Sequence, residues 1–145
     1  MTTDLRTVID TSVAVSAVLL PRSVPRRAFD TAAERGRLLV SEATIEELEE
    51  VLRRPKFEKY VLEPARLEFL AGLLNQAEII PITFHTSECR DPRDNKFLDL
   101  AVSGHATHLI SGDDDLLVLN AIQGILILKP QEFLLAIDEQ EKSSS

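Results

Sequence analysis

The sequence predicts an α/β fold, a three-layer α/β/α sandwich around a central, mostly parallel sheet of five strands. Short, continuously apolar runs alternate along the chain with longer segments of helical periodicity. Continuous apolar runs are typical of parallel strands that are covered on both faces. With 145 residues, 44% of them hydrophobic, the chain has the size of one ordinary domain. We expect a single domain over residues 1–138 and a polar, frayed tail over residues 139–145.

The predicted strands are short apolar runs, several of them rich in β-branched residues. They cover residues 6–9, 38–40, 77–80, 108–110 and 125–128. The first of them ends at Asp10, a residue type that is disfavoured in strands. We therefore expect the chain to leave the sheet at that position and to enter a helix.

Helices are predicted between and after these strands from capping residues and apolar periodicity. They cover residues 12–19, 25–36, the segment that follows Ser41, 64–75, 91–105 and a short segment from Pro130. Thr11 or Ser12 is the expected N-cap of the first helix, and Asp91 is the expected N-cap ahead of Pro92. The helix after Ser41 carries one apolar stripe, and Glu47 lies at the edge of that stripe.

Composition excludes several classes of function. The net charge of −8 argues against binding nucleic acid through a broad basic surface, because such binding neutralises phosphates. It leaves open an enzyme that meets phosphates through a metal ion. The single cysteine, Cys89, excludes an internal disulfide and a multi-cysteine zinc site. We see no signal peptide, membrane span or phosphate-binding glycine loop, so we expect a cytoplasmic protein without membrane contact.

Four acidic side chains are candidates for one site. Asp10 follows the first predicted strand and Asp113 follows the fourth, and open parallel sheets bind ligands beyond the carboxyl ends of their strands. Asp94 lies in line with the buried face of its helix, and Glu47 borders an apolar stripe. Like charges about 4 Å apart repel by roughly 4 kcal/mol near a protein surface. Oxygen-preferring divalent ions such as Mg²⁺ or Mn²⁺ would offset that repulsion.

Each acid also has a plainer structural interpretation. Asp94 could interact only with the free amides at its helix start, and Asp113 could cap a turn over residues 114–117. Glu47 could be an ordinary solvated helix residue. The conjunction of all of them favours a metal site, with Asp115 as a further candidate ligand and Asp114 facing solvent.

With these acids in place, the chain resembles the PIN domain family of metal-dependent ribonucleases, in particular the bacterial VapC-like toxins of toxin–antitoxin pairs. The matching pieces are VIDTSV, SEATIEELEEVLRRPKF, CRDPRDNKFLDLAV and SGDDDLLVL, which begin at residues 8, 41, 89 and 111. The resemblance covers nearly the whole chain, so the domain over residues 1–138 is expected to be one PIN domain.

The resemblance implies a role for each acid. Asp10, Glu47, Asp94 and Asp113 would be the catalytic, metal-binding quartet, and Asp115 a fifth metal ligand. The supporting residues would be Thr11, Ser12 and Ser111. Family members usually have Asn at the position of Ser12 and commonly Thr at that of Ser111. Ser111 retains the hydroxyl group, whereas Ser12 has a shorter side chain than Asn, so the resemblance leaves the role of Ser12 in the site open.

The expected activity is that of an endoribonuclease that hydrolyses phosphodiester bonds with one or two Mg²⁺ or Mn²⁺ ions. The expected partners are RNA, an antitoxin protein and a second copy of the chain as a homodimer. One alternative is a catalytically weak module that mainly binds an antitoxin or itself, through Ala14, Val18 and Leu19 or through residues 67–74. Another is a metal-dependent phosphatase or DNA nuclease. Arginines from Arg22 to Arg27 and at Arg53 and Arg54 either contact phosphates or form a solvated face.

Overall fold

The computed structural model describes residues 4–87 and 91–143 and contains one six-stranded sheet. The strands are β1 (Leu5–Ile9), β2 (Gly36–Val40), β3 (Glu78–Ile79), β4 (His108–Ile110), β5 (Ala121–Ile122) and β6 (Ile125–Leu128). Their order across the sheet is β3-β2-β1-β4-β6-β5, and all neighbours pair in parallel except β5 and β6. The mostly parallel sheet is confirmed, with one strand more than the five that were predicted.

The additional strand, β5, forms an antiparallel hairpin with β6 at one edge of the sheet. The two residues between them, Gln123 and Gly124, both have positive φ angles, of 48° and 82°. Two-residue hairpin turns require this left-handed backbone. A strand of two residues has no apolar alternation to detect, and Gln-Gly is a weaker turn signal than Asn-Gly, so sequence patterning overlooked it.

Helices follow the strands in the order that the sequence predicts. They are α1 (Thr11–Leu19), α2 (Val24–Arg35), α3 (Glu42–Leu52), α4 (Glu63–Gln76), α5 (Asn95–Ser103), α6 (Asp114–Leu117) and α7 (Pro130–Ser143), with 3₁₀ turns over Pro55–Phe57 and Pro92–Asp94. None of the helices in the described part of the chain is long and apolar enough to cross a membrane.

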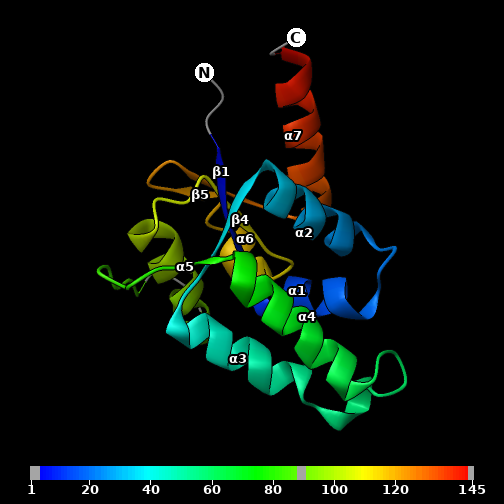
Figure 1. Ribbon diagram of the computed structural model, residues 1–145. Helices are drawn as coiled ribbons and strands as arrows, with labels where there is room; N and C mark the ends of the chain where they lie inside the picture. Colours follow the sequence, from blue (N-terminus) through cyan, green and yellow to red (C-terminus); the bar gives the residue numbers. More distant parts are fainter. Residues whose placement is uncertain (1–3, 88–90, 144–145) are drawn as a thin grey trace.

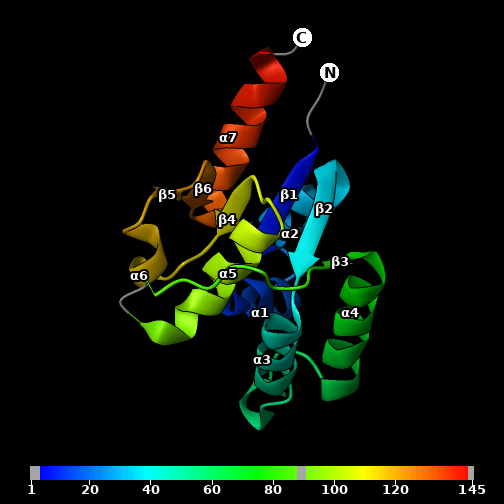
Figure 2. The same ribbon diagram turned by 90° about the vertical axis from the view of Figure 1, so that its left-hand side faces the viewer.

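The sheet separates two apolar cores, which makes the three-layer arrangement visible in Figures 1 and 2. Side chains alternate between the faces along each strand. Leu38 and Ile110 contact the core formed with α1, α2, α3, α4 and α7, whereas Leu39 and Leu109 contact the core formed with α5 and α6. The predicted α/β/α sandwich is therefore confirmed.

The carboxyl ends of β1 and β4 lie side by side. Ile9 pairs with Ile110 in the sheet, and the backbone amide of Asp10 donates to the Ile110 carbonyl oxygen at 3.0 Å. Asp10 and Ser111 consequently leave the sheet at the same level. Figure 2 shows α1, α3 and the start of α5 gathered below these strand ends, while α7 extends in the opposite direction.

Several local expectations differ from the structure. Among them, the helix predicted over residues 91–105 is a 3₁₀ turn over Pro92–Asp94 followed by α5, and the strand predicted over residues 77–80 is β3 over Glu78–Ile79. Helix α1 begins at Thr11 and is capped by Asp10, not by Thr11 or Ser12, because the Asp10 carboxylate accepts the Val13 amide. Ala14 and Val18 are buried in the core, so neither offers a surface to a partner.

The C-terminal segment is helical over more of its length than the sequence predicted. Helix α7 continues to Ser143, so residues 139–143 of the tail that was expected to be frayed are helical. Ion pairs join Asp138 to Lys142 and Glu141 to Arg35 there. Pairs with this spacing, and pairs to a neighbouring helix, favour additional helical turns.

Gly36, at the start of β2, permits a close approach to β1. A side-chain carbon at this position would lie 1.9 Å from the carbonyl oxygen of Leu5. Any larger residue would push the two strands apart, and these strands position the site. Cys89, the single cysteine, lies outside the described residues.

Candidate functional site

Asp10 is a buried carboxylate with both oxygens held by donors. Its side chain is 3% exposed. Oδ1 accepts from the Val13 amide at 2.9 Å and from the Ser12 hydroxyl at 3.2 Å, and Oδ2 accepts from the Ser111 hydroxyl. Burial raises the pKa of Asp10, and the hydrogen bond from Ser111 is the strongest influence in the opposite direction. The sequence thus produces a fixed acid at the carboxyl end of β1.

Ser111 connects Asp10 to the acids that follow β4. Its oxygen accepts from the Asp113 amide at 2.9 Å while its hydroxyl donates to Asp10. Asp113 in turn caps α6, because its Oδ1 accepts from the Asp115 amide at 2.8 Å. Asp114 is exposed, as the sequence predicted. The capping interpretation of Asp113 is therefore correct, and it leaves Asp113 beside the other acids.

Glu47 is held between α1 and α5. Thr11 donates its hydroxyl to Oε2 of Glu47, and the ammonium group of Lys96 donates to Oε1 at 2.7 Å. The Glu47 and Lys96 side chains are 30% and 24% exposed. Sequence reasoning overlooked Lys96 because a single lysine on a helix is ordinarily a solvated residue. Its position two residues after Asp94 was the available signal.

Asp94 is the acid whose charge is least compensated. Its side chain is 9% exposed, and its Oδ2 is buried without a hydrogen-bond partner among the described residues. Burial, followed by the neighbouring carboxyl of Asp113, raises the pKa of Asp94 to about 7, with smaller contributions from Asp91 and Asp10. A buried acceptor without a donor costs about 1–3 kcal/mol. A proton or a cation at this oxygen would remove that cost.

Asp91 also lies among these acids, although the sequence suggested only a capping role for it. Its Oδ1 accepts from the Arg93 amide at 3.0 Å, which confirms the cap. Carboxylate oxygens of Asp91, Asp94 and Asp115 also lie within 4.8 Å of one another. This group of three shares only Asp94 with the predicted quartet.

The structure thus brings every predicted acid to the same end of the sheet, in two connected parts. Asp10 and Glu47 are fixed by hydroxyl, amide and ammonium donors. Asp94 instead lies beside other carboxylates, those of Asp113, Asp91 and Asp115. Each of the supporting residues Thr11, Ser12 and Ser111 donates to one acid.

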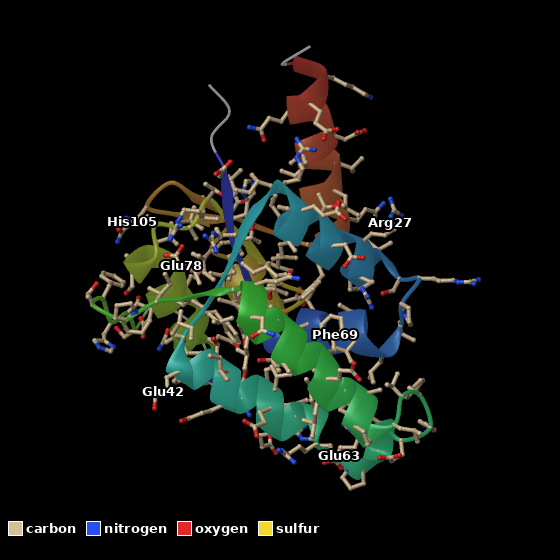
Figure 3. The ribbon with its side chains drawn as sticks, in the orientation of Figure 1. Arg27, Glu42, Glu63, Phe69, Glu78 and His105 are labelled. Carbon is tan, nitrogen blue, oxygen red and sulfur yellow. The ribbon has the colours of Figure 1, made fainter. Side chains whose placement is uncertain are left out.

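Several of the arginines pair with acids four residues away in the chain. Arg26 contacts Asp30, Arg53 contacts Glu49, and Arg54 contacts Glu50, each with helical i,i+4 spacing. Figure 3 shows Arg27 on α2, on the opposite side of the molecule from His105, which follows α5. These observations favour the solvated face over phosphate contact.

The fold and the acidic strand ends together define a class of α/β domain with a carboxylate site beyond β1 and β4. The chain belongs to the PIN domain family, whose model matches residues 6–115. It is 32% identical over 117 residues to the uncharacterized protein MJ1680 of Methanocaldococcus jannaschii, an alignment that covers 79% of this chain and 75% of that protein.

Solved structures share the fold at low sequence identity. The structure of VapBC2 from Rickettsia felis, bound to a DNA fragment from their promoter, matches with a TM-score of 0.60 and 17% identity, over 85% of this chain and 97% of that one. PAE2754 from Pyrobaculum aerophilum matches with a TM-score of 0.56 and 15% identity, over 94% and 99%. The T. brucei RRP44 PIN domain matches with a TM-score of 0.51 and 15% identity, over 97% and 85%.

Proposed function

We propose that this PIN domain is a metal-dependent endoribonuclease that hydrolyses RNA phosphodiester bonds, and that it is the toxin component of a toxin–antitoxin pair. One observation carries the proposal: Oδ2 of Asp94 is buried without a donor in the described structure, beside the carboxyl of Asp113. Membership of the PIN domain family and the likeness in fold to VapBC2 support it.

The residues present fit a divalent cation. Carboxylate oxygens are the ligands that Mg²⁺ and Mn²⁺ prefer. In the proposal Asp10, Glu47, Asp94 and Asp113 hold one or two ions, with Asp115 as a further ligand. A bound ion supplies an activated water and stabilises negative charge on the leaving oxygen.

The remaining residues orient these acids. Ser111, Ser12 and the Val13 amide fix the Asp10 carboxylate, which leaves its lone pairs in a defined direction. Thr11 and Lys96 fix Glu47 in the same way. The positive charge of Lys96 also offsets part of the negative charge of these acids, which reduces their repulsion of an RNA phosphate.

The test is cleavage of single-stranded RNA by purified protein with Mg²⁺ or Mn²⁺, compared between the wild type and Asp94→Asn. We expect cleavage that chelation abolishes and that Asp94→Asn reduces at least a hundredfold. Asp114→Asn, an exposed neutralisation at the same end, is the matched control and should retain activity. Unchanged cleavage by Asp94→Asn would identify a contaminating nuclease.

Single-stranded DNA and a small phosphate ester belong in the same series of substrates. A metal-dependent DNA nuclease or phosphatase would act on these in preference to RNA, using the same acids. Cleavage confined to RNA supports the endoribonuclease.

A second candidate function is a binding module with little turnover. It is favoured by a groove between α2 and α7 in which Val24, Leu134 and Leu135 lie, with Leu135 59% exposed. Mixing the protein with the product of a small neighbouring reading frame separates the candidates. A nuclease is active alone and silenced by its antitoxin, whereas a module forms the complex, or a homodimer, without metal-stimulated cleavage.

A further inference from the structure

The loop before α5 arranges two acids on one side of a tight turn. Pro92–Asp94 is a 3₁₀ turn, and the Asp94 amide donates to the Asp91 carbonyl oxygen at 3.0 Å. A 3₁₀ turn has three residues per turn, so side chains three apart lie one above the other. Asp91 and Asp94 are therefore brought to the same face, although capping alone would require only Asp91.

A third acid meets them from the other side of the site. Asp115 lies in the first turn of α6, and one carboxylate oxygen from each of Asp91, Asp94 and Asp115 lies within 4.8 Å of the other two. Oxygens opposite each other around Mg²⁺ or Mn²⁺ are about 4.2 Å apart, since each bond is about 2.1 Å long. The three acids can thus reach a single ion with small side-chain rotations.

An independent observation points to a cation here. Asp94 is 9% exposed, and its Oδ2 has no hydrogen-bond partner in the described part of the chain. The hydroxyl groups that hold the other acids contact Asp10 and Glu47. Two more carboxylates, those of Asp91 and Asp115, lie near Asp94. They make the burial of an ionised Asp94 costly unless a positive charge binds among them.

We propose that Asp91, Asp94 and Asp115 together bind a divalent metal ion, with Asp91 as a ligand outside the predicted quartet. The inference rests on the proposed function in taking Asp94 and Asp115 as metal ligands, and Asp91 is the ligand that it adds. It adds a cation position that includes Asp91 and is distinct from a position held by Asp10 and Glu47, and we call it the outer position.

Arg93 is the exchangeable counter-ion of this position. Its guanidinium group contacts Oδ2 of Asp91 at 2.8 Å while its side chain is 83% exposed. Exposed ion pairs of this kind contribute little to stability, so a metal ion displaces the arginine at low cost. Removing the Arg93 side chain should therefore strengthen metal binding. If Asp91 served only as a cap, this removal would leave metal binding unchanged.

The test measures binding of Mn²⁺ alone to the full chain, by counting free Mn²⁺ with electron paramagnetic resonance. Asp91→Asn is the principal variant, because Asn caps a helix about as well as Asp and leaves the turn intact. We expect Asp91→Asn and Asp115→Asn each to weaken Mn²⁺ binding at least tenfold. Asp114→Asn, which removes the same charge from an exposed neighbour, should change it less than twofold.

Arg93→Met should have the opposite effect on Mn²⁺ binding. We expect it to tighten Mn²⁺ binding about threefold, whereas Arg53→Met, at an exposed pair elsewhere, leaves binding unchanged. Wild-type affinity in Asp91→Asn, losses in Asp91→Asn and Asp115→Asn no larger than that of Asp114→Asn, or no Mn²⁺ binding at millimolar concentrations would each overturn the proposal.

The outcomes for this site and for the proposed function are separable. Metal-stimulated RNA cleavage together with wild-type Mn²⁺ affinity in Asp91→Asn refutes the outer position and leaves the nuclease standing. Loss of affinity in Asp91→Asn from a protein that cleaves no RNA establishes the outer position and refutes the nuclease.

Discussion

Replacing Asp94 by Asn should stabilise the metal-free protein at alkaline pH. Burial and the neighbouring acids raise the pKa of Asp94 from 3.8 to about 7. Since each pKa unit corresponds to about 1.4 kcal/mol, ionised Asp94 reduces the free energy of unfolding by at most about 4 kcal/mol. Water at the open side of the site screens part of this, and the Asn amide also needs partners. We expect a net gain of about 2 kcal/mol at pH 8.

The sign of the pH dependence follows from the two protonation states. The folded protein holds the Asp94 proton up to about pH 7, whereas the unfolded chain releases it near pH 4. The wild type therefore loses stability as the pH rises between these values, and Asp94→Asn lacks that loss. The difference between the two proteins should be small near pH 4 and largest above pH 7.

Urea denaturation followed by circular dichroism, with a chelator at pH 4.5, 6 and 8, measures the effect. Asp114→Asn serves as the control, because this exposed carboxylate has no burial to relieve. A variant less stable than the wild type at pH 8, or a difference that stays constant with pH, would refute the uncompensated charge that we assign to Asp94.

Three further outcomes are expected. Mn²⁺ at a hundred times its dissociation constant should raise the free energy of unfolding of the wild type by about 2.7 kcal/mol, and much less in Asp94→Asn, as thermal denaturation would show. Arg66→Met should cost about 3 kcal/mol in urea, because the fully buried guanidinium donates to three backbone carbonyl oxygens and to a glutamate. The exposed Arg53→Met should cost less than about 0.5 kcal/mol. Gly36→Ala should destabilise by about 3 kcal/mol or more, since its new methyl group meets the adjacent strand, whereas Gly72→Ala, in an open helical position, should stabilise by about 0.5–1 kcal/mol. Equal effects of the two alanines would contradict the close strand approach.

The fold could be predicted from the sequence because its signals are local. Continuous apolar runs such as His108–Ile110 identify buried parallel strands, and caps such as Ser41 identify helix starts. The missing strand β5 has two residues, too few for any period to be recognised. Helix α7 is longer than expected because its last turns depend on ion pairs, one of them with α2.

The site could be predicted only in part, since a sequence indicates where acids are but not what neutralises them. Asp10 could be predicted because Asp is disfavoured in strands and this one directly follows a buried strand. The pairing of Glu47 with Lys96 joins residues on separate helices, a contact that needs the tertiary structure. Asp91 was underestimated because an N-cap role is sufficient reason for an acid ahead of Pro92, and that role is real.

The two outermost strands, β3 and β5, have two residues each. Their unpaired backbone groups are therefore few, and Pro81, two residues beyond β3, has no amide hydrogen to offer. A neighbouring molecule finds almost no template on which to add a strand. This favours a protein that resists fibril formation when concentrated, so that association between copies depends on side chains of the helices.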